Sequence, residues 1–202
     1  MDENIPLGQD FFAAMGDVLT KPGRSLCAAD VADADVLLVR SVTQVNEVLL
    51  AGSRVGFVGT CTIGTDHLDT TYLDQQGIGW SNAPGCNADS VTEYVLSCLA
   101  CLKPQWLRAS VGIVGCGNVG GRLYQRLLAL GVVCKVYDPF LTTEKISDLS
   151  SLDEVLGCDV VCVHAPLTTD TAHPSFHLLG VEQLGQLKHG AVLISAGRGA
   201  VI

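Results

Sequence analysis

The sequence has few positive charges, few aromatic residues and no long apolar run. Its 12 Lys and Arg face 21 Asp and Glu, which leaves a formal net charge of −9. A nucleic-acid partner would require a basic face, so this balance argues against one. No segment reaches the ~18 uncharged apolar residues of a membrane span. The start Met1-Asp2-Glu3 is also unlike a signal peptide, so we expect a cytoplasmic protein without a membrane partner.

The cysteines lack the arrangement of a disulfide framework or a metal site. There are nine, an odd number, and they are scattered through apolar runs. This favours reduced, buried thiols in a cytosol. Cys98 and Cys101 form a CxxC inside an apolar helical run, without a second pair, so core packing is favoured over a redox or zinc role. No metal site is expected.

Apolar side chains, by contrast, are abundant. Hydrophobic residues make up 48% of the chain and charged residues 16%, which is ample for a packed core. A length of 202 residues allows one α/β domain or two small lobes. Short β-branched runs alternate with helical patterns throughout, which is typical of parallel βα units and predicts the α/β class.

In the first half the pattern predicts three strands and three helices. The strands are expected at residues 36–39, 55–60 and 78–81, and the helices at 45–51, 67–76 and 89–102. Gly52 and Gly77 are placed to end the first two helices, and Thr65 or Asp66 to cap the second at its start. Pro104 prevents continuation of the third helix, and residues 103–110 are interpreted as a connector.

The second half shows the same alternation more clearly. Strands are expected at residues 111–114, 132–137, 159–164 and 191–195, and helices from about 118 to 130, after Ser151, and at 181–188. Ser151 and Glu154 have the spacing of a capping box, and Gly131 is placed to end the first of these helices. Four strands do not complete a doubly wound sheet, whose classical order is 3-2-1-4-5-6.

A glycine-rich turn opens this second series. Gly115, Gly117 and Gly120 follow a strand and open a helix, which is the context that a dinucleotide-binding turn requires. Gly115 would permit the tight turn, Gly117 would let a pyrophosphate approach the backbone, and Gly120 would let helix and strand pack closely. The N–H groups of the helix start would hold the phosphates.

Asp138 follows the next strand, where an acid can bind both ribose hydroxyls of NAD. The same carboxylate would repel the 2′-phosphate of NADP, so NAD is the expected cofactor. An ordinary strand-ending turn at Asp138-Pro139 is the structural alternative.

Two further side chains follow strands of the second half. Arg198 lies between glycines after the last strand, where ligands bind in open α/β sheets, and its guanidinium suits a carboxylate. A solvated loop arginine is the alternative. His164 also ends a strand, and we interpret it as a neighbour of the cofactor or as a hydrogen-bonded structural residue.

Several motifs together resemble the D-isomer-specific 2-hydroxyacid dehydrogenases. The matching stretches are residues 2–6 (DENIP), 39–43 (VRSVT), 57–69 (FVGTCTIGTDHLD), 83–88 (APGCNA), 113–120 and the GRG at 197–199. The resemblance covers nearly the whole chain. It implies a flavodoxin-like substrate lobe at residues 1–102, the connector at 103–110 and an incomplete Rossmann domain, a doubly wound parallel sheet, at 111–202.

The resemblance also implies roles for individual residues. Ser41 and Thr62 match substrate-binding positions, although either hydroxyl could equally cap a local loop. Arg198 matches the catalytic arginine. The cofactor-contacting positions are matched by Gly115, Gly117, Asn118, Val119, Gly120, Asp138, Ala165, Ala196, Gly197 and Arg198. Ala165 stands where a threonine is expected, so a hydroxyl contact is lost there. The implied substrate is a small phosphorylated hydroxy acid.

The family also has features that this sequence lacks. Its acid–base histidine, supporting glutamate and dimerisation region lie beyond the GRG loop, and an apolar strand precedes the DEN motif. Both ends therefore look trimmed relative to the intact family member, which is expected to be a homodimer. We expect these 202 residues alone to show no appreciable NADH formation. Two alternatives remain open: a dehydrogenase acting on glycerate or phosphoglycerate, and a non-catalytic NAD-binding regulator.

Overall fold

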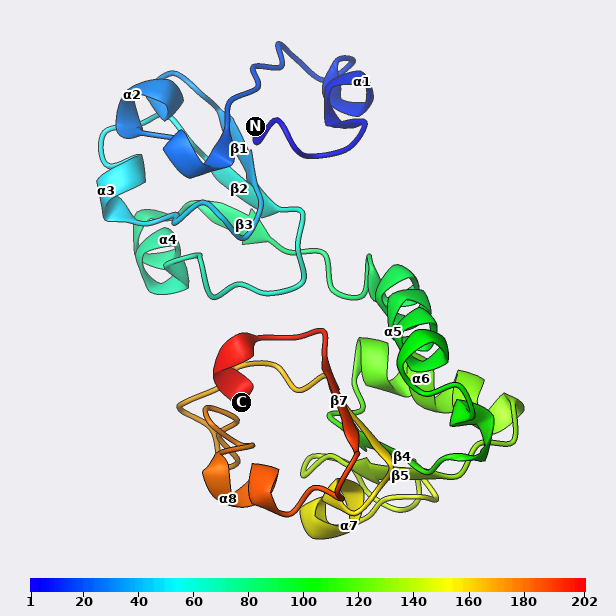
Figure 1. Ribbon diagram of the computed structural model, residues 1–202. Coiled ribbons are helices and arrows are strands. Elements are labelled where there is room, and N and C mark those ends of the chain that lie inside the picture. Colours follow the sequence, from blue (N-terminus) through cyan, green and yellow to red (C-terminus); the bar gives the residue numbers. More distant parts are fainter. The chain divides into compact units, whose positions relative to one another are not determined.

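The structure, a computed structural model, describes residues 1–202 and divides into two compact units (Figure 1). The first unit is Met1–Cys86 and the second is Asn87–Ile202. The helix at 88–102, which the sequence analysis assigned to the first lobe, packs with the second unit. The connector that was expected after this helix contains a short 3-10 helix, Trp106–Arg108.

The first unit is built on a parallel sheet. Its strands are β1 (Val36–Val39), β2 (Phe57–Thr60) and β3 (Gly79–Ser81), in the order β1-β2-β3. The helices of this unit are α1 (Gly8–Phe12), α2 (Ala28–Val31), α3 (Glu47–Leu50) and α4 (Thr70–Gln76), with a 3-10 helix at Gly23–Ser25. Leu37, Val39 and Val58 are buried in one core cluster with side chains of α2, α3 and α4, because alternate residues of a strand face the same side of a sheet.

Two single-residue pairings extend this sheet beyond β1. The N–H of Asp2 donates to the carbonyl of Leu38 at 2.9 Å, and Asp2 forms an isolated parallel bridge with Lys21. Counting Asp2 and Lys21 as the first two strand positions gives the order 2-1-3-4-5. This is the flavodoxin-like order, as predicted.

The helices α3 and α4 are shorter than predicted. The helix expected from residue 67 begins at Thr70, because Asp69 rather than Thr65 or Asp66 caps it: the Asp69 carboxylate accepts from the N–H of Tyr72 at 3.0 Å. Gly77 ends the helix as predicted, at a φ of 69°. The sequence analysis missed α1 and α2, which are too short to show a helical period.

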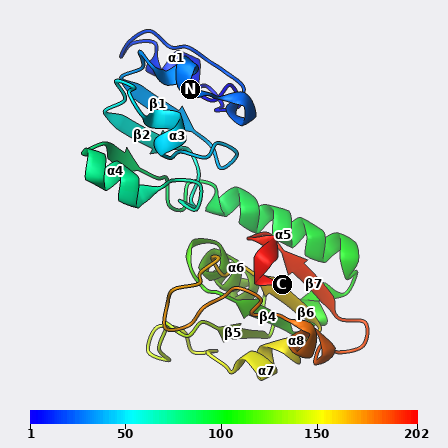
Figure 2. The same cartoon turned by 90° about the vertical axis from the view of Figure 1, so that its left-hand side faces the viewer.

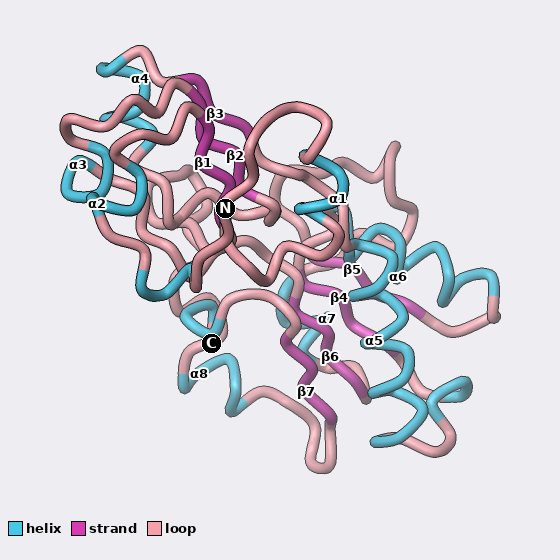
Figure 3. The backbone as a smooth tube through the Cα atoms, turned by 90° about the horizontal axis from the view of Figure 1, so that it is seen from above, coloured by secondary structure: helices cyan, strands magenta, loops and turns pink.

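The second unit contains a four-stranded parallel sheet (Figure 3). Its strands β4 (Val111–Val114), β5 (Cys134–Tyr137), β6 (Val160–Val163) and β7 (Val192–Ser195) lie in the order β5-β4-β6-β7. Its helices are α5 (Ala88–Leu102), α6 (Asn118–Ala129), α7 (Leu152–Leu156) and α8 (Val181–Gly185), followed by a 3-10 helix at Gly199–Val201. All residues of β4 and β6 are buried, as expected for inner strands covered on both faces.

One strand position of this sheet was missed. Leu149 forms an isolated parallel bridge with Val136 of β5, supported by a 2.7 Å hydrogen bond from the N–H of Ser150 to the carbonyl of Val136. With Leu149 as the third position, the order becomes 3-2-1-4-5, the beginning of the classical doubly wound order. The expected fold class is confirmed, although the expected count of four strands omitted this position.

The helices α5 and α6 pack side by side on one face of this sheet (Figure 2). Val95 and Leu99 of α5 meet Leu123 and Leu127 of α6 in one core cluster, and all four are 0% exposed. In each helix the two residues are four apart, which is a spacing of an apolar helix face, and this explains why sequence periodicity found both helices. Truncating such a leucine to alanine typically costs about 2–5 kcal/mol.

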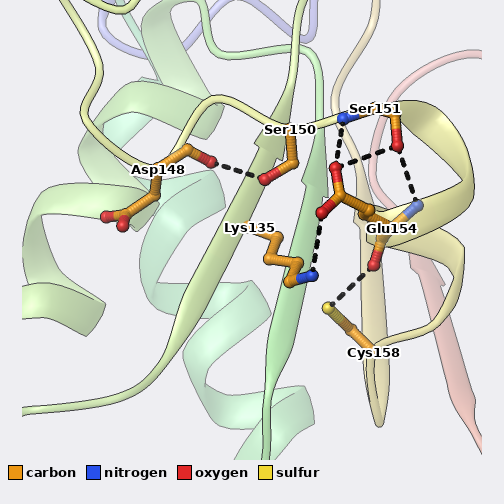
Figure 4. Close-up of polar contacts among 6 residues, drawn as sticks. All are labelled: Lys135, Asp148, Ser150, Ser151, Glu154 and Cys158. Carbon is orange, nitrogen blue, oxygen red and sulfur yellow. Dashed lines mark hydrogen bonds and ion pairs between the residues drawn. The ribbon is translucent and has the colours of Figure 1, made fainter.

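The capping box predicted before α7 is present (Figure 4). The N–H of Glu154 donates to Oγ of Ser151 at 3.3 Å, and the N–H of Ser151 donates to the Glu154 carboxylate at 2.9 Å. The N–H of Ser151 and its hydroxyl, which donates to the same carboxylate at 3.0 Å, lower the pKa of Glu154, and Nζ of Lys135 at 3.4 Å lowers it further.

The cysteines are free, but the expectation that they are buried was wrong for several of them. Cys134, Cys158 and Cys162 are buried, whereas Cys27, Cys61, Cys86 and Cys101 are exposed. Of the CxxC pair, Cys98 packs against the core and Cys101 faces outward. No three side chains of the metal-binding types gather as they would around a metal ion. None of the helices combines the length and the apolar character needed to cross a lipid bilayer.

Candidate dinucleotide-binding site

The glycine-rich turn joins β4 to α6 and is shaped by two close approaches. Gly115 has a φ of 86°, and a Cβ there would lie 2.6 Å from the backbone N of Ala165. A Cβ on Gly120 would lie 2.0 Å from the carbonyl oxygen of Gly115. Any larger residue at either position would push the helix or the neighbouring loop away, so both glycines are needed for the turn itself.

Gly117 differs from the other two glycines of the motif. It is the N-cap of α6, it is exposed, and a Cβ there would meet no atom within 4 Å. The first N–H groups of a helix have no partner within the helix, and they lie at the positive end of its dipole. The space above Gly117 therefore fits an anionic group such as a pyrophosphate.

Asp138 follows β5 and is bound to this turn through its carboxylate. Oδ2 accepts a 2.9 Å hydrogen bond from the N–H of Cys116, and Oδ1 accepts one of 3.0 Å from the N–H of Phe140. Each carboxylate oxygen has more than one lone pair, so both retain capacity for a further donor. The carboxylate is held beside the turn, where a ribose would follow a bound pyrophosphate.

The loops after β6 and β7 lie against the same turn. Ala165 follows β6 and contacts Gly115, as described above. A Cβ on Gly197, which follows β7, would lie 3.4 Å from the carbonyl oxygen of Ala165. The structure thus brings the expected cofactor positions Gly115, Ala165 and Gly197 together at the carboxyl ends of three parallel strands.

The remaining expected positions adjoin these loops. Asn118 and Val119 open α6, and Ala196 precedes Gly197. Arg198 is half-buried and starts the turn into the 3-10 helix at Gly199–Val201. Its partial burial is compatible with a ligand-binding arginine and with a solvated loop arginine, so the role of Arg198 stays a prediction.

His164 is in an apolar setting. Its Nε2 is buried without a hydrogen-bond partner, and burial lowers the pKa of the imidazole to about 4. Of the two expectations for His164, the hydrogen-bonded structural residue is not supported at Nε2. The ring is neutral at pH 7, which makes it a poor candidate for a charged ligand contact.

The two expected substrate-binding residues lie in the first unit. Ser41 is exposed in the loop after β1, and Thr62 is half-buried after β2. Val39 and Thr60 pair in register on these neighbouring parallel strands, so the two loops leave the sheet at the same edge. Oγ1 of Thr62 lies 2.8 Å from Oγ1 of Thr60, which in turn lies 2.8 Å from Nε2 of His67.

No role was predicted for Thr60, His67 or Cys116. His67 was expected only as the first residue of a helix at 67–76. Their contacts depend on neighbours across the fold, so no local pattern marks them. The one available signal was the polar pair Thr60 and Thr62 around the end of an apolar strand.

A protein-family sequence model, that of the catalytic domain of D-isomer specific 2-hydroxyacid dehydrogenases, matches residues 3–190 of the chain. The chain belongs to this family.

Curated relatives are similar to the chain along its whole length. It is 59% identical over 201 residues to an erythronate-4-phosphate dehydrogenase of Cellvibrio japonicus, matching 100% of this chain and 53% of the relative. It is 52% identical over 202 residues to one of Teredinibacter turnerae, matching 100% of this chain and 55% of the relative. The chain spans about half the length of the curated relatives it matches.

Solved structures share its fold. The NAD+-bound 3-phosphoglycerate dehydrogenase of Entamoeba histolytica superposes with a TM-score of 0.81 at 26% identity, over 96% of this chain and 67% of that one. A D-lactate dehydrogenase of Aquifex aeolicus, complexed with NAD and lactic acid, superposes with a TM-score of 0.79 at 23% identity, over 98% and 68%.

Proposed function

We propose that this chain is part of an NAD-dependent dehydrogenase that oxidises C2 of 4-phospho-D-erythronate to the 2-oxo acid, a step of pyridoxal phosphate biosynthesis. The observation that carries the substrate is the 59% identity to an erythronate-4-phosphate dehydrogenase across the whole chain. We further propose that the intact protein acts in the cytoplasm as a homodimer.

The turn of the second unit is proposed to hold NAD. Gly117, Asn118 and Val119 would bind the pyrophosphate through the first turn of α6, which has open space above it. Asp138 would accept the ribose hydroxyls, and its charge would reject the 2′-phosphate of NADP. The loops that carry Ala165, Ala196 and Gly197 would complete the site. When bound, NAD would supply the hydride acceptor.

Ser41, Thr62 and Arg198 are proposed to serve the substrate. The guanidinium of Arg198 can donate two parallel hydrogen bonds to a carboxylate, which would orient the hydroxy acid and polarise the carbonyl that forms at C2. The hydroxyls of Ser41 and Thr62 would donate to anionic oxygens of the same molecule. His164 is not proposed as the proton acceptor, because its Nε2 is buried and its pKa is lowered to about 4.

Absorbance of NADH tests this proposal in the full-length gene product. The substrates should include 4-phospho-D-erythronate, 3-phosphoglycerate and D-glycerate, each with an acceptor system that removes the product. We expect kcat/KM to be highest for 4-phospho-D-erythronate with NAD. A preference for 3-phosphoglycerate or glycerate would favour another dehydrogenase of the family. NAD binding without any turnover would favour a regulator.

A further inference from the structure

Three polar side chains form a hydrogen-bonded row at the carboxyl end of β2. Oγ1 of Thr60 lies 2.8 Å from Nε2 of His67 on one side and 2.8 Å from Oγ1 of Thr62 on the other. Thr60 is 3% exposed and His67 is 2% exposed, whereas Thr62 at the outer end is half-buried. Buried polar groups are costly unless they are paired, so both contacts of Thr60 are hydrogen bonds.

The number of hydroxyl hydrogens limits the direction in which hydrogen bonds can be donated along this row. A threonine hydroxyl has one hydrogen to donate, and Thr60 has two neighbours. In the first arrangement His67 donates from Nε2 to Thr60, Thr60 donates to Thr62, and the hydrogen of Thr62 remains available. In the second arrangement Thr62 donates inward to Thr60, Thr60 donates to His67, and Thr62 offers only lone pairs to a ligand.

A contact of Thr62 distinguishes the two arrangements. Its Oγ1 lies 3.4 Å from the carbonyl oxygen of Gly64, which can only accept. Thr62 can donate to Gly64 only if its hydrogen is not used by Thr60, as in the first arrangement. At 3.4 Å this bond is long and therefore weak, so the hydrogen can be transferred to a closer and more negative acceptor.

The backbone around Thr62 is held in place by the neighbouring loop. The N–H of Ala83 donates to the carbonyl of Thr62 at 3.1 Å, and the side-chain amide of Asn82 donates to the carbonyl of Ile63 at 2.7 Å. β2 lies between β1 and β3, and ligands of open α/β sheets bind outside the carboxyl ends of the strands. Thr62 is therefore a fixed donor at the edge of the sheet where a ligand is expected.

We infer that His67 is a positioning residue: by donating from Nε2 to Thr60, it keeps Thr62 a hydrogen-bond donor for an anionic oxygen of the substrate. This inference rests on the proposed function, which makes Thr62 a substrate-binding residue. It adds that Thr62 is the hydrogen-bond donor in that contact. Carboxylate and phosphate oxygens only accept hydrogen bonds, so a Thr62 with its hydrogen turned inward would repel them.

Substitutions in the full-length gene product test the row. Thr60→Val keeps the shape but can neither accept nor donate a hydrogen bond, so it removes the inward acceptor for Thr62. The hydrogen of Thr62 then stays available, and we expect the KM for 4-phospho-D-erythronate to remain near that of the unaltered protein. The KM for NAD should also be nearly unchanged.

Changes at His67 should act differently. His67→Leu removes the donor, so Thr60 can accept from Thr62 instead, and the substrate KM should rise by ~10-fold, since hydrogen bonds to charged groups contribute about 1.5–3 kcal/mol. His67→Gln retains an N–H and should lie near the unaltered protein. Thr92→Val is the matched control, because Thr92 is also buried but its hydroxyl donates only to Ala88 of its own helix. Thermal unfolding of every variant separates loss of the row from loss of the fold.

A double-mutant cycle tests whether His67 acts through Thr60. If it does, Thr60→Val should restore the substrate KM in a His67→Leu background, because Thr62 then has no inward acceptor. A KM that stays high in the double variant would overturn the inference and make Thr60 and His67 merely structural.

The protonation of His67 gives a readout that does not depend on turnover. In 15N-edited NMR spectra at a pH where the ring is neutral, we expect the hydrogen on Nε2, and we expect its signal to shift in Thr60→Val. A neutral ring with an unprotonated Nε2 would overturn the inference whatever the substrate. If Nε2 is protonated but no substrate of the panel is oxidised, the proposed function fails while the direction of the row stands.

Discussion

The backbone N–H of Cys116 donates a 2.9 Å hydrogen bond to Oδ2 of Asp138, which lies 22 residues further along the chain. The bond joins the turn after β4 to the end of β5, two strands that pair in parallel register. A second N–H, that of Phe140, binds the other carboxylate oxygen. The acid proposed to bind the ribose is thus oriented by the same turn that is proposed to bind the pyrophosphate.

Replacing this carboxylate should relax the choice between cofactors. In Asp138→Asn the negative charge is lost, and the amide has one oxygen for the two N–H groups. We expect NAD affinity to fall ~10-fold and the preference for NAD over NADP to shrink by at least as much. Titration of both cofactors measures this, with the exposed Asp153→Asn in α7 as the control. If the unaltered protein binds NADP as tightly as NAD, Asp138 does not discriminate.

Substitutions at two glycines of the turn should affect NAD binding and folding stability separately. The Cβ added by Gly117→Ala would meet no atom within 4 Å, so the midpoint of thermal unfolding should be nearly unchanged. Its methyl group would, however, occupy the space proposed for the pyrophosphate, and NAD affinity should fall ~10-fold or more. Gly120→Ala would place a Cβ 2.0 Å from the Gly115 carbonyl oxygen and should lower the midpoint by several degrees.

Gly185→Ala is the matched control for this pair, because a Cβ there also meets no atom within 4 Å and Gly185 ends α8, away from the turn. It should change neither quantity. Retention of full NAD affinity by Gly117→Ala would show that the pyrophosphate does not approach the backbone there.

His164 should make the fold sensitive to mild acid. Burial lowers its pKa to about 4 in the folded state, from an ordinary 6.5. Between these values the unfolded chain binds a proton that the folded chain does not, so stability is lost as pH falls from about 6.5 to about 4. The full effect of such a shift is at most roughly 3 kcal/mol.

In His164→Leu this part of the pH dependence should disappear. Thermal midpoints at pH 7.5 and pH 5 measure it, with the exposed His189→Gln as the control for loss of an imidazole. The difference between the two midpoints should be smaller in His164→Leu than in the unaltered protein. An unchanged difference would mean that the imidazole is solvated or paired in solution.

The thiols should differ sharply in reactivity. Cys27, Cys86 and Cys101 are exposed, whereas burial raises the pKa of Cys134 and of Cys162 to about 12. Because the thiolate is the reactive form, we expect a disulfide reagent at pH 8 to label the exposed group within minutes. The two buried thiols should react only after denaturation. Mass spectrometry of the labelled peptides identifies the sites, and rapid labelling of native Cys162 would contradict its burial.

Much of the second unit could be predicted from the sequence because its signals are local. β4, the glycine turn and α6 lie within 20 residues, and each is encoded by short-range features: a β-branched run, three glycines and an apolar period of three to four. The capping box of Ser151 and Glu154 is likewise a matter of spacing. Local steric and hydrogen-bonding preferences act over a few residues, so they can be recognised without the fold.

The tertiary structure alone decided the features that depend on pairing between distant backbones. Leu149 and Lys21 add strand positions to the two sheets through single main-chain bridges, which require no particular side chain and leave no sequence pattern. The row from His67 to Thr62 exists because a chain turn returns His67 to the end of β2. The sequence by itself determined the class of fold, because periodicity is local, and its motifs carried the resemblance to the family. Which polar atoms meet was decided only by the tertiary structure, since a buried group must find its partner wherever the fold places one.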